Sequence, residues 1–179
     1  ERRVCLIYDP LHSKAIDYLF LRIRSYAPTG VPTPKKDILR QLLTWKREGR
    51  FSLSGYIADQ SPKWENIHLW LPFLNHPETP VFTGAERIAR KMNDAVYYVK
   101  MTRPRRGYYD VEYVPITDDP ASLPDGEVTR RFFKMLEQSI KEAPAYYLWT
   151  HNRWKRTKEE FDRLYTVENG KVKRRADNA

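Results

Sequence analysis

Several residue types that build common active sites are scarce in this chain. Of its 179 residues, one is cysteine and four are histidine. The lone Cys5 excludes an intramolecular disulfide, and no Cys/His group has the spacing of metal ligands. The serine residues lack the Gly-x-Ser-x-Gly setting of a nucleophile elbow, which argues against a serine hydrolase. We therefore expect a reducing compartment and no cofactor.

The chain also lacks long apolar runs and has fewer acidic than basic residues. No apolar run approaches the roughly 18 to 20 residues that cross a bilayer, and no signal peptide is recognisable, so a peripheral or soluble protein is expected. Lys and Arg number 32 against 23 Asp and Glu, which gives a formal net charge of +9. Such a charge favours an anionic partner: a nucleic acid, an acidic carrier protein or an anionic membrane surface.

The pattern of apolar residues in the first third of the chain predicts an α/β fold. Short apolar runs bounded by turn residues indicate strands at 3–8 and 51–58. Apolar residues at steps of three and four indicate amphipathic helices at 13–26 and 34–48. This order predicts parallel strands joined by helical crossovers.

In the rest of the chain, some segments show a clear periodicity of apolar residues and others do not. The sequence predicts helices at 84–93 and 126–142, and between them a hairpin of strands at 95–101 and 109–114. The aromatic and apolar residues at 63–82 show no clear periodicity, so we expect them to fill the core or to line a cleft.

Length favours one domain, and the charge pattern sets its boundary. We expect a single, partial α/β domain at 1–156 and a charged tail at 157–179. The sequence begins with Glu1 rather than Met, and a predicted strand follows almost at once. We therefore expect an excerpt from a longer protein.

A polar loop follows the predicted strand at 51–58. It opens with the carboxylate of Asp59 and the carboxamide of Gln60. Because ligands of α/β proteins bind at the carboxyl ends of strands, these two side chains are predicted to form the rim of a site. The alternative is an ordinary turn that Asp59 starts and Ser61 and Pro62 continue.

Several segments between residues 4 and 156 share their order and spacing with one enzyme family. They are YDPLHSKAID at 8–17, ADQ at 58–60, PF at 72–73, residues 83–90, the strand at 95–101 and WTHNRWK at 149–155. Together they resemble the late acyltransferases of lipid A biosynthesis, the lauroyl/myristoyl transferase family of Gram-negative bacteria.

This resemblance implies a fold and a reaction. The fold would be of the glycerolipid-acyltransferase type, with a mixed, mainly parallel sheet flanked by helices and incomplete at its amino terminus. The reaction would move a fatty acyl chain from an acyl-carrier-protein thioester to a hydroxyl of a lipid A precursor. It would take place at the cytoplasmic face of the inner membrane.

Family members that resemble this chain carry a catalytic histidine and a carboxylate with four residues between them. The histidine removes the proton of the attacking hydroxyl, and the carboxylate orients the ring. His12 and Asp17 have this spacing, but they lie about 140° apart around a regular helix. Their surroundings also resemble the family segment downstream of the catalytic pair. We therefore expect the catalytic pair to precede Glu1, with His12 and Asp17 as the alternative.

A second departure from the family lies at Asp9, where many members that resemble this chain carry a basic residue. A cation there would stabilise charge on the thioester oxygen or on a phosphate, which an aspartate cannot do. The alternative cations near this position are Arg2, Arg3 and Arg22.

Basic residues elsewhere are candidates for substrate binding. Clusters at 87–91 and 103–106 suit lipid phosphates, an acidic carrier protein or anionic head groups, whereas the alternative is a solvated basic face. We predict that Arg87, Arg90 and Arg153 bind substrate together with Asp59 and Gln60. Within the segment of Arg153, Trp149 and Trp154 are candidate anchors of the chain on the sheet, and Trp149 is the favoured one. His68 and His76 are expected to be ordinary loop histidines.

Two other functions compete with acyl transfer. Aromatic residues interleaved with Arg at 103–113 and 146–156 favour a basic nucleic-acid-binding module, although no RNA-recognition or zinc-finger signature supports it. The predicted partners are therefore acyl carrier protein, a lipid A precursor and the anionic inner-membrane surface, not nucleic acid. A third interpretation is an inactive fragment that keeps only the fold and the binding surfaces, and we expect this of the present chain and acyl transfer of its longer parent.

Overall fold

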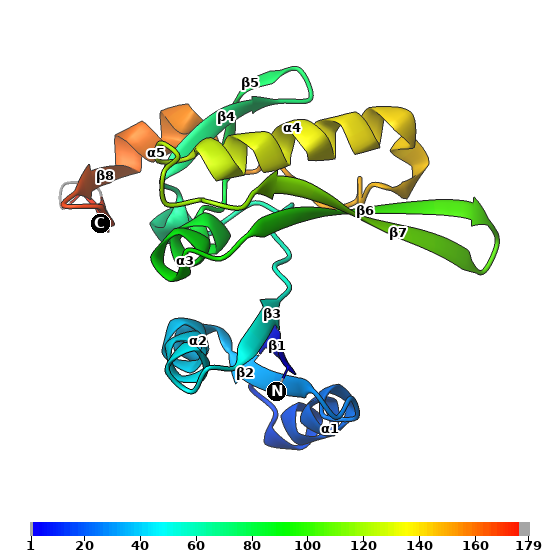
Figure 1. The fold of residues 1–179 in the computed structure, drawn as a ribbon. Coiled ribbons are helices and arrows are strands. Elements are labelled where there is room, and N and C mark those ends of the chain that lie inside the picture. Colours follow the sequence, from blue (N-terminus) through cyan, green and yellow to red (C-terminus); the bar gives the residue numbers. More distant parts are fainter. Residues whose placement is uncertain (1, 176–179) are drawn as a thin grey trace. The chain divides into compact units, whose positions relative to one another are not determined.

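The computed structural model describes residues 2–175, and the first part of the chain forms a small parallel sheet. Strand β1 (Arg2–Tyr8) lies between β2 (Gly30–Pro34) and β3 (Phe51–Ser54), and both neighbours run parallel to it. The central position of β1 buries Cys5, which pairs with β2 on one side and with β3 on the other. The predicted parallel arrangement is confirmed for this sheet (Figure 1).

Two helical crossovers connect these strands. Helix α1 (Lys14–Arg24) joins β1 to β2, and a 3₁₀ turn, η1 (Lys35–Asp37), leads into α2 (Ile38–Arg47), which joins β2 to β3. Helix α2 buries residues at steps of three and four, as an amphipathic helix requires: Ile38, Leu42 and Trp45. Helix α1 is also amphipathic, but no residue of it is buried. Its apolar side is therefore open in this part of the structure.

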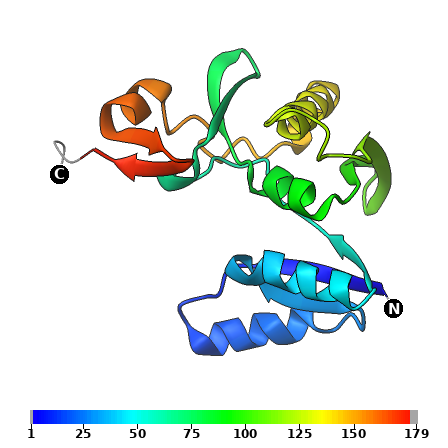
Figure 2. The same ribbon diagram turned by 60° about the vertical axis from the view of Figure 1, so that its left-hand side comes forward.

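A long helix organises the second part of the chain. Helix α4 (Glu127–Glu142) lies between two antiparallel hairpins. One hairpin consists of β4 (Leu69–Phe73) and β5 (His76–Val81), and the other of β6 (Val96–Arg105) and β7 (Tyr108–Thr117). Figures 1 and 2 show α4 with one hairpin on each side. The predicted hairpin after residue 95 and the predicted helix at 126–142 are both confirmed.

The hydrophobic core follows from this position of α4, because two sides of the helix bury apolar residues. Towards β4 and β5 the buried cluster consists of Leu71, Phe73, Val81, Phe133 and Ile140. Towards β6 and β7 it consists of Tyr98, Ile116 and Val128. Phe132 and Leu136 pack against both clusters, so the two form one continuous core around the helix.

A buried carboxylate caps the start of α4. Glu86 belongs to α3 (Gly84–Met92) and is only 4% exposed. Its carboxylate accepts hydrogen bonds from the backbone amide of Gly126 at 2.8 Å, and from the amide of Thr129 at 3.0 Å and its hydroxyl. Because the first amides of a helix lack intrahelical partners, Glu86 satisfies two of them and complements the helix dipole.

The last described residues pack on the second part of the chain. Helix α5 (Lys158–Leu164) is followed by a hairpin of β8 (Tyr165–Glu168) and β9 (Lys171–Arg174). Phe161 of α5 is buried against two aromatic side chains, with ring centroids 6.4 Å from Trp64 and 5.7 Å from Trp70. Much of the expected charged tail at 157–179 thus carries regular structure, and residues 176–179 lie outside the described residues.

The chain forms two compact units that divide between Ile57 and Ala58. The predicted α/β class is confirmed, because helices and strands are mixed in both. A mainly parallel sheet is not confirmed. In residues 2–175 the parallel sheet has three strands, and the other sheets are antiparallel pairs.

Candidate functional site

The loop that was predicted to form a site lies at the start of the second unit. Strand β3 ends at Ser54, earlier than the predicted end at 58, and the chain reaches Asp59 through an irregular stretch. Ala58 and Pro62 are buried, whereas Asp59 is half-buried and Gln60 is exposed. The loop is therefore held at both ends while its carboxylate and carboxamide remain accessible.

The segment after α4 contacts this loop directly. The backbone amide of Ser61 donates a hydrogen bond to Nε2 of His151 at 3.3 Å. Nε2 of His151 is therefore the acceptor in this contact. The bond joins two stretches that lie 90 residues apart in the sequence.

Arg153 is the most unusual residue of this region. It is only 1% exposed, and its guanidinium lies 5.5 Å from the ring centroid of Phe133 and 6.0 Å from that of Phe73. Its three side-chain nitrogens are buried and form no hydrogen bond within residues 2–175. A buried guanidinium without hydrogen-bond acceptors is costly, so an anionic acceptor would stabilise it.

Two further groups share the electrostatic environment of Arg153. Burial lowers the pKa of Arg153, while the nearby phenol of Tyr147 and carboxylate of Asp59 raise it. The pKa of half-buried Tyr147 is raised, mainly by burial and further by Asp59, whereas Arg153 lowers it. A carboxylate, a guanidinium and a phenol therefore interact in one place. The sequence had pointed to Asp59 and Arg153, but it offered no specific signal for Tyr147.

Trp154 fixes this segment to the β4–β5 hairpin. Its indole stacks on the ring of His76 with centroids 4.0 Å apart, and its Nε1 donates to the hydroxyl of Thr79 at 2.9 Å. Trp149, which was predicted to be the anchor, is instead half exposed and donates to the carbonyl of Pro144. That prediction was wrong, and so was the expectation of an ordinary loop position for His76, which lies in β5.

Arg90 makes its contacts at another place in the second unit. Its Nη1 donates to the carbonyl oxygens of Pro120, at 3.2 Å, and Leu123, and its Nη2 lies 3.2 Å from the carboxylate of Asp125. The guanidinium thus holds the loop before α4. None of these contacts brings it to Asp59.

Arg87 is exposed on the same helix, α3. Partial burial lowers the pKa of His68, and the charge of Arg87 lowers it further. Arg87 therefore lies near an imidazole, separate from the contacts that surround Arg153.

His12 and Asp17 belong to the first unit. His12 is exposed, and Oδ1 of Asp17 accepts a hydrogen bond from the backbone amide of Leu11 at 2.9 Å. This bond caps the turn before α1. Across the part of the chain that the structure describes, no histidine ring is hydrogen-bonded to a carboxylate.

Among residues 2–175, no three His, Cys, Asp or Glu side chains gather as metal ligands. In the same part of the chain, no helix is long and apolar enough to cross a bilayer.

Comparison with known proteins adds the last observation. The model of a family described as bacterial lipid A biosynthesis acyltransferase matches residues 2–156. The match includes the loop of Asp59 and the segment of His151 and Arg153. Comparison with curated proteins gives no match.

Proposed function

The chain belongs to the bacterial lipid A biosynthesis acyltransferase family, and from this premise we propose that it binds the substrates of an acyl transfer to a lipid A precursor. The donor is an acyl-carrier-protein thioester, and the acceptor is a hydroxyl of the precursor. The fold is of the glycerolipid-acyltransferase type. The reaction takes place at the cytoplasmic face of the inner membrane.

The observation that carries the proposal is the buried guanidinium of Arg153 beside Asp59. Among residues 2–175 the buried nitrogens of Arg153 have no hydrogen-bond acceptor, which suits a phosphate or another anionic group of the substrate. The half-buried carboxylate of Asp59 accepts hydrogen bonds from substrate hydroxyl or amide groups, and the carboxamide of Gln60 both donates and accepts. We assign substrate binding to these three residues.

Arg87 and Arg90 take a supporting place in this proposal. The exposed Arg87 is free to meet an anionic group of the lipid or of the carrier protein. Arg90 contributes through the loop that it holds, since its guanidinium already contacts two carbonyl oxygens and the Asp125 carboxylate.

The chemical step is a direct acyl transfer without an acyl-enzyme. The acceptor oxygen forms a bond to the thioester carbon, the carbon–sulfur bond breaks, and the carrier thiol leaves with a proton. A general base must remove the proton of the attacking hydroxyl. We place this base outside the described residues, because none of their histidines is bonded to a carboxylate. His12 and Asp17 are the alternative pair.

Binding assays with this chain test the proposal. We expect a lipid A precursor to bind, and Asp59→Asn and Arg153→Met each to weaken binding at least about tenfold, as loss of a charge-assisted hydrogen bond predicts. His12→Ala should leave binding unchanged. Salt-sensitive binding of single-stranded nucleic acid, with no affinity for the precursor or for acyl carrier protein, would overturn the proposal in favour of a nucleic-acid-binding module.

A further inference from the structure

One face of the β6–β7 hairpin carries a row of exposed apolar and aromatic side chains. Val99 pairs with Tyr113 and Met101 with Val111, and Tyr97 precedes them on the same face because side chains alternate along a strand. These five residues are between 47 and 62% exposed. We call them the apolar row.

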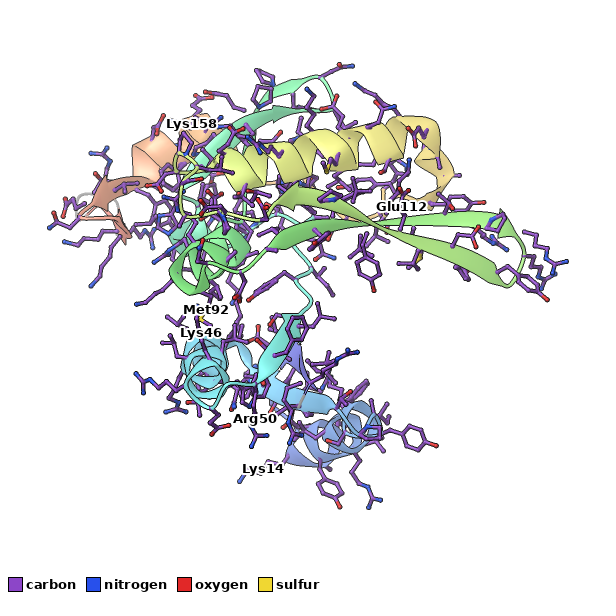
Figure 3. The ribbon with its side chains drawn as sticks, viewed as in Figure 1. Lys14, Lys46, Arg50, Met92, Glu112 and Lys158 are labelled. Atoms are coloured by element: carbon purple, nitrogen blue, oxygen red, sulfur yellow. The ribbon has the colours of Figure 1, made fainter. Side chains whose placement is uncertain are left out.

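The opposite face of the same hairpin is the one that packs on α4. Tyr98 and Ile116 are buried there, and the hydroxyl of Tyr98 donates to Ser139 of the helix at 2.9 Å. Lys100 reaches Glu142 on α4, and its strand partner Glu112 lies on the same face (Figure 3). The face of the hairpin that contacts α4 therefore carries both apolar and charged residues. The other face, which carries the apolar row, is exposed.

The turn of the hairpin is strongly basic. Arg103, Arg105 and Arg106 lie within four residues, and no acidic side chain occurs between 103 and 109. The guanidinium of Arg105 lies 3.7 Å from the ring centroid of Tyr108, and Tyr108 is itself more than half exposed. Arg103 is partly buried, with its guanidinium 6.0 Å from the ring centroid of Tyr146, whereas Arg105 and Arg106 are exposed at the end of the apolar row. We call these three arginines the basic turn.

We propose that the β6–β7 hairpin is a membrane-docking element, which lays the apolar row on an anionic bilayer and sets the basic turn against lipid phosphates. The inference rests on the proposed function in one respect, namely that the acceptor is a membrane lipid. Apolar side chains enter the boundary of the acyl chains, and tyrosine rings favour the interface because one end is apolar and the other is wet.

Charge decides between a bilayer and a second copy of the chain as the occupant. Each Lys or Arg near an anionic surface strengthens binding about fivefold, so the basic turn contributes roughly 100-fold. The chain has a net charge of +9. Two copies of the chain therefore repel each other, whereas an anionic bilayer attracts each copy. An occupant with phosphates at its surface and hydrocarbon beneath matches the basic turn and the apolar row together.

Vesicle co-sedimentation of the complete chain tests this assignment. The vesicles consist of phosphatidylcholine with or without phosphatidylglycerol, and they contain neither a lipid A precursor nor an acyl donor. We expect binding only to the anionic vesicles. Replacing Arg103, Arg105 and Arg106 together by Gln should weaken it roughly 100-fold. The matched control removes the same charge elsewhere, at the exposed positions Arg47, Lys63 and Lys134, and should weaken binding only a few-fold.

A fluorescent probe reports which face of the β6–β7 hairpin contacts the lipid. A polarity-sensitive label on Met101→Cys should shift to the blue with anionic vesicles, whereas the same label on Glu112→Cys, on the opposite face, should not. Equal losses for the basic-turn and control variants, or a label at Met101 that does not shift, would overturn the proposal. A dimer without vesicles that Val99→Ser dissociates would instead assign the row to a second copy. None of these results depends on acyl transfer.

Discussion

The backbone amide of Ser61 donates to Nε2 of His151, so the segment after α4 holds the loop of Asp59. The two residues are 90 positions apart in the sequence. The bond is long, at 3.3 Å, and partly buried, which makes it a modest but directional contact. The position of the Asp59 carboxylate therefore depends on an imidazole from a distant segment.

Replacing His151 by Phe should loosen the loop of Asp59. The variant keeps a ring of similar shape but offers no acceptor to the amide of Ser61. Since a hydrogen bond of this kind contributes about 1 kcal/mol, the Ser61 amide should exchange with solvent about five times faster. Hydrogen exchange measured by NMR checks this. His12→Phe serves as the control, and equal exchange in both variants would contradict the assignment.

Arg153→Met should separate stability from substrate binding. A buried charge without hydrogen-bond acceptors costs free energy, and an apolar side chain of similar length removes that cost. We expect the free energy of unfolding to stay unchanged or to rise, while affinity for the lipid A precursor falls. Urea unfolding and a binding titration measure the two quantities. A variant that unfolds more easily would show that Arg153 stabilises the fold.

Glu86→Ala should destabilise the second unit through the start of α4. The change leaves the amides of Gly126 and Thr129 without acceptors in a buried place. Hydrogen bonds to a charged group are strong, so we expect a loss of about 3 kcal/mol in the free energy of unfolding. Glu137→Gln is the control on α4, because its pair with Lys141 is solvent-accessible and should contribute about 0.5 kcal/mol or less.

The ion pair of Lys100 and Glu142 predicts a pH dependence. Their hydrogen bond is the largest cause of the lowered pKa of Glu142 and of the raised pKa of Lys100. The pair's stabilising contribution is therefore complete between the ordinary values of 4.5 and 10.5. It is lost as the pH falls through the lowered pKa of Glu142 or rises through the raised pKa of Lys100.

Carboxyl NMR titration tests this coupling. Lys100→Met should raise the pKa of Glu142 towards its ordinary value. The variant Lys134→Met removes the same charge at an exposed position of α4, the helix that carries Glu142. It should leave the pKa of Glu142 unchanged. A Glu142 titration that is the same in the native chain and in Lys100→Met would rule out the hydrogen bond as its cause.

Periodicity predicted the long elements of the fold but not the strands that contain proline. Apolar residues of α4 recur at steps of three and four, and apolar and polar residues alternate along the β6–β7 hairpin. Both elements were therefore predicted from sequence. The β4–β5 hairpin was missed because Pro72, Pro77 and Pro80 interrupt it. Its turn carries a usable signal, since Leu74 and Asn75 have φ of +49° and +65° and asparagine favours such angles.

Proline also concealed β2, which holds Pro32 and Pro34. An edge strand tolerates proline because one side needs no backbone donors, and β2 is an edge of the parallel sheet. Sequence alone does not reveal which predicted strand will be an edge. The element is therefore visible only once its pairing with β1 is known.

The sequence pointed to candidate site residues one by one but not to their arrangement. Strand-end position pointed to Asp59, and the resemblance to a family pointed to the segment of Arg153. Neither signal shows that His151 would bind the amide of Ser61 or that Arg153 would be buried beside two phenylalanine rings. Such contacts arise from packing between segments far apart in sequence, which local patterns do not encode.

The boundary between the two compact units falls immediately before the loop of Asp59. The residues that surround the guanidinium of Arg153 therefore all belong to the second unit. A gene divided between the codons of Ile57 and Ala58 would place the entire cluster in its second product, while the parallel sheet and its crossover helices would be translated as a separate polypeptide.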